Sequence, residues 1–354
     1  MFLVCLCFIC VLVPVFCVFA YMNKSELRRD IVSGQWVIIA PKRVGRPLDF
    51  SHAKARKKSA KKTCPFENPQ ESEGGAPLLV RPNETPEKWK IQIIKNKYPA
   101  LEHAGGMCAS FTRKGFYEVS DGIGYHHVLV LRDHETNIPD LSAHDAWEIF
   151  DALQEHYHEL SLDPCVEYVS MFQNWGPTAG ASIYHPHLQV IAIPVVPIGI
   201  LRSLDGSRDY ERKHRACPHC TILDFELKEK KRILYESRNV VAFAPFVSRE
   251  AYEFRIFPRR HNAYFEDEKK KVLQDVADVL RLLLKNVRAR LGDPDYNFYI
   301  HSAPTKHKKR HAHYHWHIEV LPKISVSAGF ELGTGIEITA VDPDDAAQLL
   351  RIKK

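Results

Sequence analysis

The chain has 354 residues, of which 45% are hydrophobic and 26% charged, and its net charge at neutral pH is +6. This length allows two domains with a large core, and the composition excludes a disordered chain, a fibrous chain and a membrane protein with several spans. So small a charge excess does not indicate a dedicated nucleic-acid binder. The 19 histidines and nine cysteines point to metal binding instead, because imidazole and thiolate are zinc ligands.

The N-terminal segment differs from the rest of the chain, because it carries no charge and is almost wholly apolar. We therefore treat residues 1–21 as a leader or anchor. A run of this length could span a bilayer, and the basic residues Lys24 and Arg28 follow it. One interpretation is a membrane anchor with the folded part on the cytoplasmic side, and another is a start codon placed upstream of Met22. A cleaved signal would require a basic n-region and a small-residue cleavage site, which are missing.

Five further cysteines lie beyond this segment, at positions 64, 108, 165, 217 and 220. Their odd number and the Cys217-Pro-His-Cys220 pair favour a reducing compartment and metal binding over disulfides. We therefore expect a cytoplasmic protein, which associates with a membrane only if the N-terminal segment is real.

The chain contains two copies of one series of motifs. A cysteine motif begins each copy, first Cys64-Pro-Phe-Glu67 and then Cys217-Pro-His-Cys220. An apolar strand that ends in a histidine follows, over 124–134 and over 251–261. A helical pattern comes next, over 146–160 and over 272–291. Each copy then has a strand that opens with His-x-His, at His185-Pro-His187 and at His315-Trp-His317.

The order of these elements predicts an α+β fold made of two histidine-triad-like units, each an antiparallel sheet packed with one long helix. A parallel sheet would require helices to alternate with the strands. Ser142 and Asp145 predict the start of the first helix, and Gly292 predicts the end of the second. We expect an N-terminal catalytic domain over 22–200 and a C-terminal domain over 201–354. The polar stretch over 197–215, with Asp205-Gly-Ser207, reads as their linker.

Each copy supplies four potential zinc ligands. The set in the second copy is Cys217, Cys220, His261 and His315, which is typical of a closed tetrahedral site. The set in the first copy is Cys64, Glu67, His134 and His185, where a carboxylate replaces one thiolate. We expect one or two structural Zn²⁺ ions that hold the His-x-His strands in place. Alternatively, Glu67 is a loop carboxylate and Cys64 a buried thiol. Four more histidines form either a further metal site or a solvated loop: His301, His311, His313 and His317.

His187 is the candidate nucleophile. Residues two apart on a strand share a face, so His187 and Gln189 lie on the same side as His185. An imidazole with a pKa of ~6.5 is largely neutral at pH 7, and its lone pair can attack phosphorus to form a covalent N-phosphoryl intermediate. The Gln189 amide can donate to a phosphoryl oxygen. The small residues between Asn174 and Ser182 allow the backbone to approach a phosphate.

These motifs resemble a known family. The pattern Asn174-x-Gly176-x-x-x-Gly180-x-Ser182-x-x-His185-Pro-His187-x-Gln189 resembles the active-site strand of the galactose-1-phosphate uridylyltransferases, a branch of the histidine-triad superfamily. Further similar blocks are 30–47, Asn96-Lys-Tyr-Pro-Ala-Leu101, 133–141 and Gly329-Phe-Glu331 with Gly333-Thr-Gly335. The likeness covers the chain from Leu27 to Arg351.

The resemblance implies an activity and a role for each matching residue. His187 would take UMP from UDP-glucose and pass it to a hexose 1-phosphate such as galactose 1-phosphate, in galactose metabolism. Gln189 and Ser182 would contact the phosphates of the nucleotide. The residues that would help to bind the nucleotide sugar are Arg43, Arg46, Asn96 and Asn174. The family's homodimer would bring Phe330 and Glu331 to the sugar site of the neighbouring subunit.

Two alternatives remain. The paired cysteines of the second copy and the Gly-Phe-Glu-x-Gly-Thr-Gly pattern also resemble the branch that acts on ADP-glucose by phosphorolysis. The other alternative is a non-catalytic zinc protein that binds nucleic acid through basic residues 54–62. The intact pair of His187 and Gln189 argues against it, so we expect no nucleic-acid partner. The second copy has Glu319 in place of Gln189, and a carboxylate would repel phosphate, so only the first copy should be catalytic.

Overall fold

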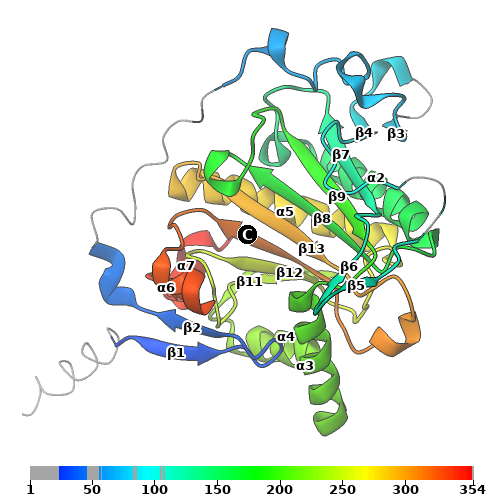
Figure 1. Cartoon of the computed structure of the whole chain (residues 1–354). Coiled ribbons are helices and arrows are strands. Elements are labelled where there is room, and N and C mark those ends of the chain that lie inside the picture. Colours follow the sequence, from blue (N-terminus) through cyan, green and yellow to red (C-terminus); the bar gives the residue numbers. More distant parts are fainter. Residues whose placement is uncertain are drawn as a thin grey trace, which may run out of the picture.

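The computed structural model describes residues 24–45, 56, 58–82, 86–103, 106 and 108–352 (Figure 1). The predicted leader over 1–21 and the predicted substrate ligand Arg46 lie outside these residues. Within the described ranges, no helix has the length and apolar character needed to cross a membrane.

Ten strands form one antiparallel sheet in the order β10-β11-β12-β14-β13-β8-β9-β7-β4-β3. The first copy supplies β3 (Leu79–Arg81), β4 (Ile91–Lys95), β7 (Tyr125–Leu131), β8 (Tyr168–Trp175) and β9 (His187–Ile193). The second copy supplies β10 (Ile233–Glu236), β11 (Val240–Phe243), β12 (Phe254–Pro258), β13 (Tyr296–His301) and β14 (His317–Pro322). The predicted antiparallel α+β fold is thereby confirmed. Because both copies share this sheet, the domain boundary near residue 200 stays a prediction.

The two long helices cover one face of the sheet and contact each other (Figure 1). They are α2 (Ala143–Leu162) and α5 (Lys270–Leu291). Ser142 caps α2 by accepting a hydrogen bond from the Asp145 N–H at 3.0 Å, and Gly292 ends α5 with φ of 75°. Both predicted helix ends are therefore confirmed. Alternate residues of each strand pack against these helices in the main core, which leaves the other residues to form the opposite face.

The remaining elements surround this sheet. A three-stranded sheet joins the two ends of the described chain: β1 (Glu26–Arg29), β2 (Trp36–Ile39) and β15 (Glu337–Thr339). A separate hairpin consists of β5 (Thr112–Lys114) and β6 (Tyr117–Val119). The other helices are α3 (Ile198–His214), α4 (Pro218–Glu229), α6 (Gly329–Thr334) and α7 (Pro343–Leu350). The short 3-10 helices used below are η1 (Pro41–Gly45) and η6 (Pro177–Ala179).

The predicted linker is in fact the helix α3, which extends from the body of the molecule (Figure 1). Gly206, part of the Asp205-Gly-Ser207 sequence that favours a linker, lies in the middle of this helix. A Cβ at Gly206 would stand 1.7 Å from the carbonyl oxygen of Val32. The glycine therefore allows the helix to approach another backbone closely, which sequence patterning cannot distinguish from a turn.

Cys108 and Cys165 form a disulfide. The expectation that the cysteines avoid disulfides was therefore wrong for this pair, although Cys64, Cys217 and Cys220 are free. The pair escaped prediction because 57 residues separate its members, and it forms where the turn after α2 meets the loop before β5.

Candidate active site

His187 begins β9 on the sheet face opposite α2 and α5. Its Nδ1–H donates to the carbonyl oxygen of His185 at 2.9 Å, so the lone pair of the neutral ring is on Nε2. Within the described residues, Nε2 makes no hydrogen bond. The side chain is 8% exposed and packs beside the Phe66 ring at 5.1 Å. Burial lowers the pKa of His187, which keeps the imidazole neutral near pH 7.

Gln189 shares this face and is held by His126 on β7, a residue that no sequence motif identifies. The N–H of Ala100 donates to His126 Nδ1 at 3.1 Å, so the neutral ring carries its proton on Nε2. That Nε2–H donates to Gln189 Oε1 at 3.0 Å. The amide nitrogen of Gln189 is consequently left to face a substrate. Asn96 also belongs to this group, because its side chain lies beside the His126 ring and its Oδ1 accepts from the Tyr98 N–H at 2.9 Å.

The loop between β8 and β9 lies beside this pair. It follows the half-buried Asn174 near the end of β8, passes through η6 and reaches the exposed Ser182. Gly176 and Gly180 have φ of 87° and 88°, which side chains other than glycine rarely adopt. The structure therefore brings His187, Gln189, Asn96 and Asn174 together on neighbouring strands and loops.

The four predicted metal ligands of the first half also converge. His134 Nε2 donates to the Ser59 carbonyl at 3.0 Å, and His185 Nε2 donates to the Leu131 carbonyl at 2.6 Å. Both neutral rings thus turn an Nδ1 lone pair toward the same point. Glu67 Oε1 lies 2.8 Å from Nδ1 of His134 and 3.6 Å from Nδ1 of His185. Cys64 Sγ lies 3.5 Å from Nδ1 of His185. Acceptors that face one another in this way fit a central cation.

The second group repeats this arrangement with two thiols. Cys217 is the N-cap of α4 and Cys220 lies in the first turn of that helix, so C-x-x-C spacing places both sulfurs on one side. The Sγ of Cys220 lies 3.4 Å from Nδ1 of His261 and 3.6 Å from Nδ1 of His315. Each imidazole again donates from Nε2 to a backbone carbonyl, at 2.7 Å for His261 and 3.0 Å for His315. This donor set matches tetrahedral zinc.

The second copy does not reproduce the nucleophile's surroundings. His317 occupies the position of His187 and donates from Nδ1 to the His315 carbonyl at 3.0 Å. Glu319, at the position of Gln189, is buried and forms an ion pair with Arg249, and His301 Nε2 lies 3.3 Å from its carboxylate. The carboxylate is therefore paired within the protein, and the prediction that only the first copy is catalytic stays a prediction.

The additional histidines do not form one group among the described residues. His301 and His317 lie together with Glu319. His313 instead donates from Nε2 to the Leu204 carbonyl on α3 at 3.0 Å. The ring of His311 lies next to that of His313, with 6.4 Å between their centres.

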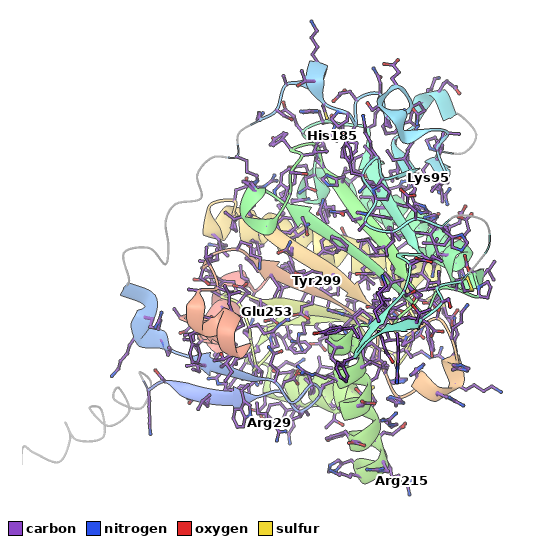
Figure 2. All side chains as sticks on the ribbon, in the orientation of Figure 1. Arg29, Lys95, His185, Arg215, Glu253 and Tyr299 are labelled. Carbon is purple, nitrogen blue, oxygen red and sulfur yellow. A yellow bond between two sulfur atoms is a disulfide. The ribbon has the colours of Figure 1, made fainter. Side chains whose placement is uncertain are left out.

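Three predicted substrate ligands lie away from His187 in this single chain. Arg43 lies on η1 directly after β2, while Phe330 and Glu331 lie on α6 before β15, which pairs with β2. Figure 2 shows Arg29 of the same small sheet and His185 at opposite ends of the molecule. Phe330 is 46% exposed. Their predicted role in a neighbouring subunit's site stays a prediction.

Two family models match the sequence. One is described as galactose-1-phosphate uridyl transferase, N-terminal domain, and matches residues 18–197, while a domain of unknown function (DUF4921) matches residues 141–352. The chain is 33% identical over 335 residues to the ADP-glucose phosphorylase of Arabidopsis thaliana, with 93% of each chain covered. It is 27% identical over 335 residues to the galactose-1-phosphate uridylyltransferase of Thermotoga maritima, with 92% of this chain and 98% of that protein covered.

Solved structures agree with these matches. The crystal structure of an ADP-glucose phosphorylase from Arabidopsis thaliana with bound ADP-glucose superposes with a TM-score of 0.80 at 31% identity, covering 94% of this chain and 100% of that chain. A uridylyltransferase structure gives a TM-score of 0.70 at 27% identity, covering 92% of this chain and 97% of that chain. The chain therefore belongs to the galactose-1-phosphate uridylyltransferase family of nucleotidyltransferases and phosphorylases.

Proposed function

We propose that this protein transfers the nucleotidyl group of a nucleoside diphosphate hexose through a covalent intermediate on His187. The observation that carries the proposal is the orientation of that side chain. Its Nδ1–H is fixed on the His185 carbonyl, which leaves Nε2 as the free nucleophile beside the amide of Gln189.

The reaction consists of two displacements at the same phosphorus. First, Nε2 attacks the α-phosphorus, the bond from phosphorus to the β-phosphate oxygen breaks, and hexose 1-phosphate leaves. The ring now carries a positive charge, which the His185 carbonyl stabilises by accepting the Nδ1–H. In the second step an acceptor phosphate oxygen attacks, the N–P bond breaks, and the neutral ring is restored. Gln189 and Asn174 donate amide hydrogens to the phosphoryl oxygens in both steps.

The donor and the acceptor define two candidate reactions. The higher identity to an ADP-glucose phosphorylase supports ADP-glucose as the donor and phosphate as the acceptor. The likeness to galactose-1-phosphate uridylyltransferases supports UDP-glucose and a hexose 1-phosphate. Both reactions use the same nucleophile. We favour ADP-glucose phosphorolysis, in contrast to the sequence-based expectation, which put uridylyl transfer first.

We further propose a Zn²⁺ ion in each of the two ligand groups. The ions would be held by Cys64, Glu67, His134 and His185 in the first half and by Cys217, Cys220, His261 and His315 in the second. All four protein ligands of each group would be engaged, so the ion would stabilise the fold and supply no chemistry to the reaction. The first group would fix His185, whose carbonyl holds the nucleophile. We also propose a homodimer, because Phe330 and Glu331 could complete a sugar site only across a subunit contact.

Donor labelling tests the function. The purified protein is incubated with ADP-glucose or UDP-glucose labelled in the α-phosphate, and the modified residue is located by peptide mass spectrometry. Labelling of His187 and its discharge by phosphate or by galactose 1-phosphate identify the reaction. Absence of label on His187 with both donors contradicts the proposal.

A further inference from the structure

The second half of the chain holds the loop that binds substrate in the first half. We propose that Asn297 on β13 is a positioning residue that turns the amide nitrogen of Asn174 toward the nucleotide phosphates. The inference rests on the proposed function, because it assigns a role in the same site.

The hydrogen bonds of Asn297 fix its orientation. Its Nδ2 donates to the carbonyl oxygen of Ala179 at 2.8 Å and to Oδ1 of Asn174 at 2.8 Å. A backbone carbonyl can only accept, so the atom of Asn297 that faces Ala179 must be the nitrogen. The second hydrogen of the same nitrogen then requires an acceptor, so Asn174 presents its oxygen to Asn297. The side chain of Asn297 is buried, and the two asparagines are cross-strand partners on β13 and β8.

The orientation of Asn174 follows from this contact. With its oxygen held by Asn297, its Nδ2 points to the other side, over Gly180, where a Cβ would lie 3.7 Å away. Asn174 makes no other side-chain hydrogen bond within the described residues, so both hydrogens of Nδ2 are available. Hydrogen bonds to charged phosphate oxygens are stronger than those between neutral groups. The opposite orientation would direct the Asn174 oxygen at the phosphates and repel them.

Asp295, which directly precedes β13, holds the same loop. Asp295 Oδ2 accepts from the N–H of Thr178 at 2.8 Å and from its hydroxyl at 2.6 Å. The loop also passes directly over this carboxylate, because a Cβ at Gly176 would lie 1.9 Å from Asp295 Oδ1. Asp295 and Asn297 thus hold η6 at both ends. This arrangement gives the second half a role in the reaction although its own copy carries Glu319 in place of Gln189.

The test compares Asn297→Ala with Asn297→Asp, which has nearly the same shape but cannot donate. In the first variant the Asn174 amide is no longer fixed, and in the second it must turn its nitrogen to the new carboxylate. We expect KM for the labelled donor to rise about 10-fold to 100-fold, with a smaller change in kcat, as for the loss of one hydrogen bond to a charged group. Asn286→Ala is the matched control, because within the described part of the chain the Asn286 amide on α5 donates only to the Leu350 carbonyl. It should change the melting temperature and leave KM unchanged.

A double-mutant cycle separates positioning from general loosening. In an Asn174→Ala background, Asn297→Ala should change KM by less than about twofold, because the group that it orients is absent. Wild-type KM in both Asn297 variants, or an undiminished effect of Asn297→Ala in the Asn174→Ala background, would overturn the inference. If the unaltered protein is labelled by neither ADP-glucose nor UDP-glucose, the proposed function itself fails, which is a distinct result.

Discussion

The substitution Glu67→Gln tests for a cation in the first half with little change in shape. Glu67 Oε1 lies 2.8 Å from His134 Nδ1, and the Nε2 of that ring donates to Ser59. A cation bound by both Glu67 Oε1 and His134 Nδ1 would explain why two hydrogen-bond acceptors lie so close together. Without a cation, a hydrogen bond between these two atoms needs a proton on Nδ1 of His134, and a glutamine amide could replace that contact by donating to Nδ1 instead. The effect of the substitution therefore depends on the metal.

We expect a large effect only when metal is bound. Exchange of one anionic ligand among four for a neutral amide should weaken binding by about 100-fold, which is ~2.7 kcal/mol of unfolding free energy when metal is in excess. At about 2.1 cal/mol/K per residue, unfolding of the 354 residues has an entropy of about 0.74 kcal/mol/K, so the melting temperature should fall by roughly 3–4 °C. After removal of metal by a chelator, the variant and the unaltered protein should differ by less than about 1 kcal/mol.

The assay combines calorimetric melting with metal analysis. The unaltered protein should retain two equivalents of zinc per chain, and Glu67→Gln should lose one of them to a competing chelator first. Glu71→Gln is the control, because Glu71 is exposed in the same segment and, among the residues the structure describes, its carboxylate accepts only from Asn68 Nδ2 at 3.2 Å. Equal destabilisation by Glu67→Gln with and without the chelator would refute the reasoning.

Three other substitutions test the site and the core. His187→Ala should abolish labelling by both donors and leave the melting temperature within about 2 °C, and any residual exchange above background in a rate assay would contradict its role. Gln189→Glu places a carboxylate beside phosphate. Repulsion of ~4 kcal/mol at a separation of 4 Å corresponds to a loss of about 10³ in the labelling rate. A loss below tenfold would show that Gln189 lies away from the phosphates. His127, buried against His156, has its pKa lowered to about 3, so folded protein excludes a proton that the unfolded chain binds below pH ~6.5. The free energy of unfolding should therefore decline by ~1.4 kcal/mol for each pH unit below pH ~6.5 because of His127. Urea titrations of His127→Gln should show a shallower decline of this free energy between pH 6 and pH 4.

Local sequence patterns were sufficient to predict the repeated units and both ligand groups. Strand alternation placed His185, His187 and Gln189 on one face, because side chains two residues apart on a strand share a side. The spacing of Cys217 and Cys220 likewise indicated a common direction. These features depend on a few neighbouring residues, and the structure reproduces them.

Features that depend on tertiary packing were not predictable. The role of His126 depends on the N–H of Ala100, which reaches it from a loop 26 residues away in the chain. The contact of Gly206 with Val32 joins segments without any shared pattern, and so does the disulfide between Cys108 and Cys165. In each case the partner is selected by the path of the chain in space rather than by local periodicity.

The pairing of β8 with β13 has a consequence for any attempt to divide this protein. Cutting the chain after α3 would leave β8 without its neighbour β13 and expose, as a sheet edge, the backbone groups that pair with β13 at five positions. Such a fragment would tend to self-associate through that edge, and a reconstituted enzyme would require both fragments to meet along it. Chimeras that combine halves of two relatives should therefore take β8 and β13 from the same parent protein.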